Sequence, residues 1–472
     1  MNLGKKTKIV CTIGPATESV EKLTALVRAG MNVMRLNFSH GDFAEHQNRI
    51  DNIKKVREKT GKTIAVIQDL GGPKIRIGEF ENGIVTLKTG QVFTLTTEKT
   101  MGNEKKAFIN YPLLPKEVKV GGYILVHDGK LKLKITDIKG KEVATKVIIG
   151  GTIKSRRGVN LPGAYLSISS ITEKDREDVE FGIKNKVDFI ALSFVRRPSD
   201  ITELRTILNA AKSKAGIIAK IETPEALDSI DEIIDLCDGI MIARGDLAIE
   251  IPAEEVPLVQ KMIIQKCNAI GKPVITATQM LESMIKSPVP TRAEVSDVAN
   301  AVIDGTDAIM LSEETTLGEY PVEAVEMMTR IALRVERDVY TADTIAQYGS
   351  SNGITDVISQ SAVLASHELG ARFIIALTVS GRTARMVARY KPAERIIALT
   401  TNDTAANQLM LSFGCYPTVV PRFSSMEEVM LLVRKVILKE KISVKGDKVV
   451  ILSGMPLGGK AQETNTILVE TL

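Results

Sequence analysis

Short apolar runs rich in β-branched residues alternate with amphipathic stretches along most of this chain. Up to about residue 340, and outside a single interruption, eight of these runs have the length and composition of buried strands. They are Ile9–Ile13, Val33–Leu36, Thr63–Asp69, Phe189–Ser193, Gly216–Ile221, Gly239–Ala243, Pro273–Ala277 and Ala308–Leu311. The stretches between them have helical periodicity. Eight strands that alternate with helices predict a closed (β/α)8 barrel, with a doubly wound open sheet as the alternative.

The alternation is interrupted from about Pro73 to Pro162, where glycine turns separate alternating strand patterns and predict a small all-β insertion. After about residue 341 a fresh strand–helix alternation predicts a separate C-terminal α/β domain. Its expected strands are Phe373–Thr378, Ile396–Thr400, Pro417–Val420 and Lys448–Ser453. We therefore expect three domains: a barrel from residues 1–72 and 163–340, an insertion over 73–162, and a C-terminal domain over 341–472.

Composition narrows the class of function. Lys and Arg exceed Asp and Glu by only five charges, aromatic residues make up 4%, and tryptophan is absent. A mild positive balance suits anionic metabolites, whereas a nucleic-acid track would need a basic stripe with stacking aromatics. No apolar stretch is long enough to span a membrane, so we expect a cytoplasmic protein. The cysteines form no CxxC pair and give little support to a zinc site; they are Cys11, Cys237, Cys267 and Cys415.

In a (β/α)8 barrel, chemistry belongs at the C-terminal ends of the strands. Polar side chains follow most of the eight strands there, and together they combine carboxylates, cations and hydroxyls. They are Arg35, Asn37, Ser39, Asp69, Ser193, Lys220, Glu222, Arg244, Asp246, Thr278 and Glu313. We expect these residues to converge on one mouth.

Two strand ends predict a metal site. Lys220 and Glu222 are two residues apart on one strand, so their side chains point the same way. Glu222 and Asp246 could share a divalent cation such as Mg²⁺, which favours one or two carboxylates plus substrate oxygens and water. A Lys–Glu ion pair that closes a barrel layer is the simpler alternative. Gly245 would let backbone N–H groups approach an anion closely, or serve only as a turn residue.

The C-terminal domain contains a second candidate anion site between a strand and a helix. The segment Thr378–Thr383 combines hydroxyls, a glycine and backbone amides at a helix N-terminus, which is the composition of a phosphate cradle. Such turns also cap helices without binding a ligand. The loop around Gly454–Lys460 could close over a ligand there.

Several long motifs, in one order, closely resemble the pyruvate kinase family over essentially the whole chain. They are TKIVCTIGPAT, MNVMRLNFSHG, IQDLGGPKIR, VNLPG, ALSFVR, GIIAKIETPEAL, IARGDLAIEIP, KPVITATQML, PTRAEVSDVANAV and IMLSEETTLGEYPVEAV. The resemblance implies a Mg²⁺- or Mn²⁺-dependent transfer of the phosphoryl group of phosphoenolpyruvate to ADP. It also implies a homotetramer, a small β-barrel lid formed by the insertion, and activation by a phosphorylated effector.

The resemblance also implies a role for each matching residue. Arg35 would clamp the phosphate, and Lys220 would neutralise the transferring phosphoryl group and the enolate. Glu222 and Asp246 would hold the metal. Thr278, with the amides of Gly245 and Asp246, would seat the substrate carboxylate and help place a proton. In the lid, Asp128 would face the site. The remaining assignments are His40, Arg76 and Lys174 to the nucleotide, and Thr378, Ser380, Gly381, Arg382 and Thr383 to the effector.

Three departures from the family pattern stand out, and one of them concerns a monovalent cation. Familiar relatives read GPEIR and bind K⁺, whereas this chain reads GPKIR and has Lys74 at the position of the acid. The ammonium of Lys74 can stand near the position of K⁺, so we expect no K⁺ requirement. The matching K⁺ ligands are Asn37, Ser39, Asp69 and the carbonyl of Leu70. The other two departures are His127 in the lid and Glu314 after the eighth strand.

Two other functions are open from the residues. One is a pyruvate-type aldolase or lyase that uses Lys220 as a Schiff base, although a lysine beside a carboxylate-bound metal should stay charged. The other is a non-enzymatic metabolite-binding module with a decayed site, which the presence of the whole set of mouth residues disfavours.

Overall fold

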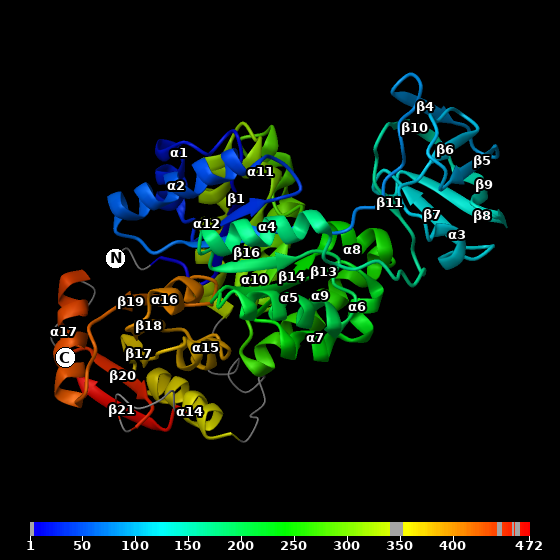
Figure 1. The fold of residues 1–472 in the computed structure, drawn as a ribbon. Coiled ribbons are helices and arrows are strands. Elements are labelled where there is room, and N and C mark those ends of the chain that lie inside the picture. Colours follow the sequence, from blue (N-terminus) through cyan, green and yellow to red (C-terminus); the bar gives the residue numbers. More distant parts are fainter. Residues whose placement is uncertain (1–3, 340–352, 441–445, 456, 458–462) are drawn as a thin grey trace.

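A computed structural model describes residues 4–339, 353–440, 446–455, 457 and 463–472 of the chain. Its centre is a closed barrel of eight parallel strands, in the order β1-β16-β15-β14-β13-β12-β3-β2 (Figure 1). The expected (β/α)8 barrel is confirmed, and the open-sheet alternative is wrong. The barrel strands are β1 (Lys8–Thr12), β2 (Val33–Asn37), β3 (Ala65–Asp69), β12 (Phe189–Leu192), β13 (Gly216–Ile221), β14 (Gly239–Ala243), β15 (Val274–Ala277) and β16 (Ala308–Leu311).

Helices surround the barrel and begin at residues suited to capping. Ser19 and Asp42 cap the first two helices, and Thr172 and Thr291 each form a capping box with an acid three residues later. Gly30 ends the first helix. The barrel helices are α1 (Val20–Ala29), α2 (Phe43–Thr60), α4 (Glu173–Lys184), α5 (Pro198–Ala210), α6 (Pro224–Asp228), α7 (Ile230–Leu236), α8 (Arg244–Glu250), α9 (Val256–Ile270), α10 (Arg292–Ile303), α11 (Glu313–Thr316) and α12 (Pro321–Val339), with 3-10 turns η1 (Ala253–Glu255) and η2 (Glu282–Ile285).

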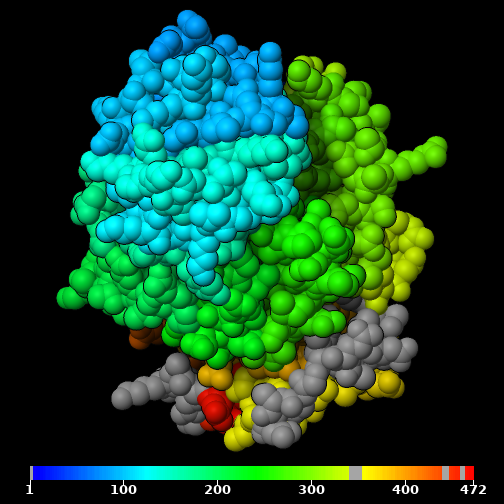
Figure 2. Space-filling model, turned by 90° about the vertical axis from the view of Figure 1, so that its right-hand side faces the viewer, coloured from blue at the N-terminus to red at the C-terminus, as the bar shows by residue number. Residues whose placement is uncertain are grey.

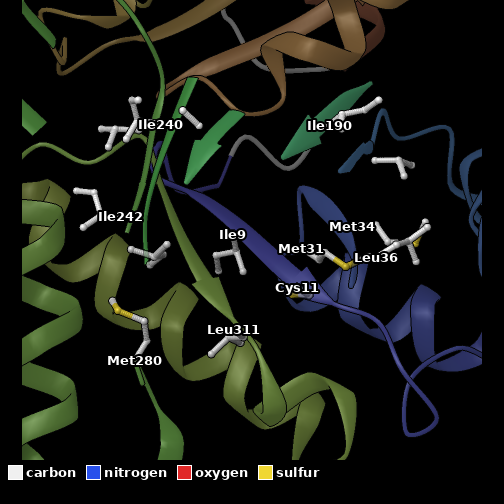
Figure 3. Close-up of a cluster of buried hydrophobic side chains, with 14 of the residues drawn as sticks. Ile9, Cys11, Met31, Met34, Leu36, Ile190, Ile240, Ile242, Met280 and Leu311 are labelled. Carbon is white, nitrogen blue, oxygen red and sulfur yellow. The ribbon is translucent and has the colours of Figure 1, made fainter. Parts of the chain in front are cut away.

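Alternate residues of each barrel strand build two cores. One set, which includes Val10, Ile67 and Met241, forms a cluster with the side chains of Met410 and Leu411 from the C-terminal domain. The other set packs against the helices, and Figure 3 shows Ile9, Cys11 and Leu311 of this layer. All four cysteines are free and buried, as expected of small apolar residues.

The insertion is all-β and has its own hydrophobic core. A six-stranded sheet of order β11-β7-β8-β9-β5-β6 packs with a two-stranded sheet, β10-β4. Figure 2 shows this lid, in blue and cyan, standing over the green part of the barrel. Its elements are β4 (Ile84–Leu87), β5 (Val92–Thr96), β6 (Lys106–Phe108), α3 (Leu114–Glu117), β7 (Tyr123–Val126), β8 (Leu131–Lys139), β9 (Glu142–Ile149), β10 (Gly151–Lys154) and β11 (Val159–Asn160).

The C-terminal domain is a five-stranded sheet, β19-β18-β17-β20-β21, in which only the edge strand β21 is antiparallel. It contacts the barrel at the opposite end from the lid (Figure 1). Lys391 forms a buried ion pair with Asp307 at 3.0 Å, and the amide of Phe413 donates to the same carboxylate at 2.9 Å. Its elements are α14 (Ile354–Glu368), β17 (Phe373–Leu377), α15 (Arg382–Ala388), β18 (Arg395–Thr400), α16 (Asp403–Leu409), β19 (Cys415–Val419), α17 (Met426–Glu440), β20 (Lys448–Ser453) and β21 (Thr466–Thr471).

The expected boundary between the barrel and the C-terminal domain, at residue 340 or 341, lies outside the described residues. Among the helices that the structure describes, none combines the length and apolar character needed to cross a membrane.

Candidate active site

A chain of buried charges crosses the mouth of the barrel at the ends of β2, β3 and β13. Arg35 Nε donates to Asp69 Oδ2 at 2.6 Å, and Lys220 Nζ lies 3.2 Å from Asp69 Oδ1. The same ammonium lies 3.0 Å from Glu222 Oε1. Asp69 and Glu222 are each 1% exposed and Lys220 is 9% exposed. The structure therefore brings together four of the residues expected at the mouth, in a site where little solvent screens their charges.

Lys220 is held in its charged form. Burial alone would lower its pKa, but Asp69 and Glu222 outweigh burial and raise the pKa above its ordinary value. Burial likewise opposes ionisation of Asp69, whereas Arg35 and Lys220 hold its pKa below the usual range. A nucleophilic lysine needs a neutral amine, so these surroundings count against Schiff-base chemistry at Lys220.

The strand end at Ser193 orients both Lys220 and Glu222. Lys220 Nζ donates to Ser193 Oγ at 2.7 Å, and that hydroxyl donates to the carbonyl of Leu70 at 2.7 Å. The amide of Phe194 donates to Glu222 Oε2 at 2.6 Å, from a backbone with φ of 53°. One oxygen of Glu222 is thus fixed by the backbone, and the other faces the ammonium. The sequence placed Ser193 at the mouth but gave no indication of this bridging role.

The carboxylate of Asp246 makes no hydrogen bond or ion pair with any residue the structure describes. It lies in the first turn of α8 and lines a cavity of about 210 Å³ between the barrel and the lid. Burial, followed by the charge of Glu222, raises the pKa of Asp246 to about 6. Two carboxylates that oppose each other's ionisation form a donor pair that a divalent cation would stabilise.

The two carboxylates of Glu222 and Asp246 suit Mg²⁺ or Mn²⁺, which binds few protein ligands. They do not suit a metal ion whose ligands all come from the protein. Among the described residues, no group of three or more His, Cys, Asp or Glu side chains is arranged to hold a metal ion. Glu222 and Asp246 would supply two oxygens and leave the other positions to substrate and water, which is the usual manner of binding Mg²⁺.

Thr278 and Gly245 meet at the ends of β15 and β14. The amide of Gly245 donates to Thr278 Oγ1 at 2.8 Å, and that hydroxyl donates to the carbonyl of Ala277 at 2.6 Å. Thr278 has a φ of 70°, which is strained for a β-branched residue and indicates that surrounding contacts hold the loop.

Arg244 is one of the contacts that hold this loop. Its guanidinium donates to both carboxylate oxygens of Asp297 at 2.7 Å and to the carbonyl of Thr278 at 2.7 Å. The sequence predicted Arg244 as one of the charges at the mouth. In the structure its guanidinium instead donates to Asp297 and to the carbonyl of Thr278. Its partner Asp297, on α10, was not among the expected residues.

Several groups form an electropositive rim beside the mouth. His40 is largely exposed, and its partial burial, together with the charges of Lys74 and Arg76, lowers its pKa. Arg76 donates to the carbonyl of Arg156 in the lid at 2.9 Å. Lys174 lies 2.6 Å from Asp178 Oδ2 and donates to the carbonyl of Phe38 at 3.2 Å. Glu313 is exposed, and its negative charge only partly offsets the lowering of the His40 pKa by the cations.

Lys74 lies against the expected monovalent-cation ligands. Its ammonium donates to Ser39 Oγ at 2.9 Å. Asn37 Oδ1 accepts the amide of Ser39 at 3.1 Å, and the carbonyl of Leu70 accepts the hydroxyl of Ser193. Asp69 is neutralised by Arg35 and Lys220. The four expected K⁺ ligands therefore already have protein partners.

The two remaining departures from the family pattern have different surroundings. His127 and Asp128 both have positive φ, 56° and 54°, and Asp128 lines the cavity beside Asp246. Glu314 is 2% exposed and accepts the amides of Leu281 at 3.2 Å and Ser312 at 2.7 Å, so it ties two loops together.

The candidate effector segment lies in the C-terminal domain at the start of α15. Gly381 has a φ of 83°, and the hydroxyls of Thr383 and Thr464 lie 2.8 Å apart. Thr378 and Thr383 are buried, whereas Ser380 is exposed. Arg382 lines a separate cavity between α15 and the barrel. Much of the Gly454–Lys460 loop lies outside the described residues.

Comparisons with known proteins agree along the chain. The family model described as "Pyruvate kinase, barrel domain" matches residues 4–325, and "Pyruvate kinase, alpha/beta domain" matches residues 356–470. A pyruvate kinase of Geobacillus stearothermophilus is 48% identical and covers 99% of this chain and 80% of its own length. One from Clostridium perfringens is 44% identical, covering 96% and 97% respectively. A crystal structure of a pyruvate kinase from Cryptosporidium parvum has a TM-score of 0.94 at 38% identity, and covers 99% of this chain and 96% of that one.

Proposed function

The chain belongs to the pyruvate kinase family, and we propose that its mouth transfers the phosphoryl group of phosphoenolpyruvate to ADP, giving pyruvate and ATP. The observation that carries this proposal is the buried ammonium of Lys220, held charged beside Glu222 and close to Asp246. Phosphoryl transfer needs positioned charge rather than a covalent intermediate on the protein. The cluster provides that charge.

In the proposed reaction, an oxygen of the ADP β-phosphate forms a bond to phosphorus while the bond from phosphorus to the enol oxygen breaks. The bonding electrons stay on that oxygen as an enolate, which is then protonated at carbon to give pyruvate. Lys220 faces this developing charge, and Arg35, held between Asp69 and the hydroxyl of Thr12 at 2.8 Å, positions the phosphate. Fixed cations aimed at developing charge stabilise the transition state most strongly in a dry site.

We propose that Glu222 and Asp246 hold Mg²⁺ or Mn²⁺. When bound, the ion supplies positive charge that orients and neutralises substrate oxygens. The unpartnered carboxylate of Asp246 and the backbone-fixed carboxylate of Glu222 support this assignment. The hydroxyl of Thr278 and the amides of Gly245 and Asp246 would bind the substrate carboxylate and place the proton.

The electropositive rim supports a nucleotide site. His40, Arg76 and Lys174 would bind the phosphates of ADP. The lid carries Asp128 toward the cavity, and Asn160 of the lid donates to Glu250 of the barrel at 2.8 Å. Closure of such a lid would exclude water from the reacting phosphoryl group.

We propose that this enzyme needs no added K⁺. The bond from Lys74 to Ser39 places a tethered ammonium among the groups that would bind the ion. This charge is present at every ionic strength.

Two further features remain proposals. A phosphorylated effector would bind at Thr378–Thr383, and Thr378→Ala/Arg382→Ala should abolish its activation. Because Arg382 also lines the cavity beside α15, Thr378→Val/Ser380→Ala, which keeps Arg382, should abolish it as well. Exposed apolar residues on α14, Ile354, Val357 and Leu364, support association of copies into a homotetramer, which light scattering would measure.

The direct test of the proposed function is a coupled assay for pyruvate formation. Pyruvate should appear only when phosphoenolpyruvate, ADP and a divalent metal are all present. Borohydride trapping with pyruvate should leave Lys220 unlabelled; labelling of Lys220 without ADP-dependent turnover would instead favour the lyase.

A further inference from the structure

A second cavity, of about 410 Å³, lies between the barrel and α15, away from the mouth. Its lining contains four basic side chains and one acid: Lys272, Arg382, Arg385, Arg389 and Asp238. Ile270 and Met386 contribute part of an apolar wall. A cavity of this size can hold a small metabolite.

The acid and two of the bases are committed to protein partners. Asp238 pairs with Arg205 at 2.5 Å and also accepts the amide of Ile217. Lys272 donates to the carbonyls of Asp235 at 3.2 Å and Cys237 at 2.5 Å. Arg389 pairs with Asp356 at 2.9 Å. These contacts leave the guanidinium groups of Arg382 and Arg385, which make no hydrogen bond or ion pair with any residue the structure describes.

Arg385 is only partly accessible to solvent, and the loop before α15 leaves space for its guanidinium. Gly381 has no side chain, and a Cβ there would lie 2.8 Å from Arg385 Nη1. Burial lowers the pKa of this guanidinium, and the charge of Asp238 only partly opposes that effect. A partly desolvated cation without an acceptor is costly, so the site favours an anion that would supply acceptors.

The cavity lies in the interface between the barrel and the C-terminal domain, and the two domains are in close contact around it. Gly271, at the end of α9, adopts a φ of 72°, and a Cβ there would lie 3.1 Å from Met386 Sδ on α15. Gln408 Nε2 donates to the carbonyl of Lys214 in the barrel at 2.9 Å. These contacts hold the barrel and the C-terminal domain together next to the cavity. A ligand could therefore fill the cavity without separating the two domains.

We propose that this cavity binds a phosphate monoester with a small aromatic or apolar body. The phosphate oxygens accept hydrogen bonds from Arg382 and Arg385, and the body packs against Ile270 and Met386. Two guanidinium groups match a dianionic phosphate better than a singly charged carboxylate. This site is separate from the mouth, and it does not use the hydroxyls of Thr378, Ser380 and Thr383.

Phenyl phosphate is a suitable probe, and tryptophan fluorescence can report its binding. The chain contains no tryptophan, and Ile270 is 40% exposed at the cavity, so Ile270→Trp introduces a single local reporter. Titration to roughly 10 mM at constant ionic strength should give a saturable change in emission. Phenol, which lacks the phosphate, should give none.

Variants in the reporter background separate this site from the others. Arg385→Met and Arg382→Met should each weaken binding by about tenfold, equivalent to loss of one charge-assisted hydrogen bond. Arg422→Met, an exposed arginine outside the cavity, and Thr378→Val/Ser380→Ala should change it less than about twofold. Arg382 is exposed, so its variant tests the proposal even if Arg385→Met unfolds α15. No saturable change, equal affinity for benzoate, or unchanged affinity in Arg382→Met would overturn the proposal.

Discussion

The ammonium of Lys74 donates a hydrogen bond to the hydroxyl of Ser39 at 2.9 Å, directly beside the buried Arg35–Asp69–Lys220 cluster. This contact joins the start of the insertion to the loop after β2. The ammonium of Lys74 thus lies among the residues expected to bind a monovalent cation, and the first prediction follows from this position.

Activity should be independent of K⁺. In Tris or tetramethylammonium buffer, adding about 0.1 M KCl should raise the rate no more than tetramethylammonium chloride does at the same ionic strength. Lys74→Glu should lower activity without K⁺ and make it recoverable by K⁺, whereas Lys88→Glu, an exposed lid lysine, should do neither. A K⁺-specific rise of about tenfold or more in the wild-type protein would show that Lys74 does not replace the ion.

Glu222→Gln should weaken metal binding. The amide can still accept the Phe194 N–H but supplies no negative charge, so Mn²⁺ affinity measured by electron paramagnetic resonance should fall by about tenfold or more. Glu232→Gln, an exposed change on α7, is the control and should have no effect. Equal Mn²⁺ affinity in both variants would show that Glu222 is not a ligand of the metal.

Asp297→Asn should lower turnover even though Asp297 is not expected to contact the substrate. Loss of the charged partner frees Arg244, which holds the carbonyl of Thr278. We expect kcat to fall by about tenfold while Mn²⁺ affinity is unchanged. The control is Asp231→Asn, which breaks an exposed ion pair with Lys266 and should leave kcat as it was. An unchanged kcat in Asp297→Asn would show that this ion pair does not position Thr278.

His46 should make the fold sensitive to acid. Burial, with help from Arg49, lowers the pKa of His46 from 6.5 to about 4, and its ring stacks on Phe38 at 4.0 Å. Between these two values the unfolded chain binds the proton and the folded chain does not, so stability falls as the pH drops. The loss from this group reaches at most about 3 kcal/mol below pH 4. His46→Gln should show a smaller fall in Tm between pH 7 and about pH 4.5, and an equal fall would contradict this account.

Most of the architecture was predictable because it is encoded locally. Each barrel strand is a compact β-branched run, and helices begin at residues such as Ser19 and Thr291 that cap them in the structure. The edge strand β21 was not predicted, since Thr466–Thr471 is only partly buried and its apolar residues do not form a buried strand pattern.

The sequence predicts which residues lie at the strand ends that form the site. It does not predict the hydrogen bonds and ion pairs that join these residues. The barrel rule places Arg35, Asp69, Lys220 and Glu222 at one mouth, yet it does not show which atoms meet. The contact of Arg244 with Asp297 joins two helices, and the amide that binds Glu222 belongs to Phe194, a residue with positive φ. The cavity beside Arg385 exists only because two domains meet there. Such features depend on tertiary packing rather than on local sequence.

The rate of ADP-dependent pyruvate formation by Lys220→Met tests the account most directly. Methionine keeps most of the length of the side chain but removes the charge aimed at the transferring phosphoryl group, so kcat should fall by about a hundredfold or more with Mn²⁺ binding and fold retained. A folded variant whose kcat falls by less than about tenfold would contradict the central role of Lys220.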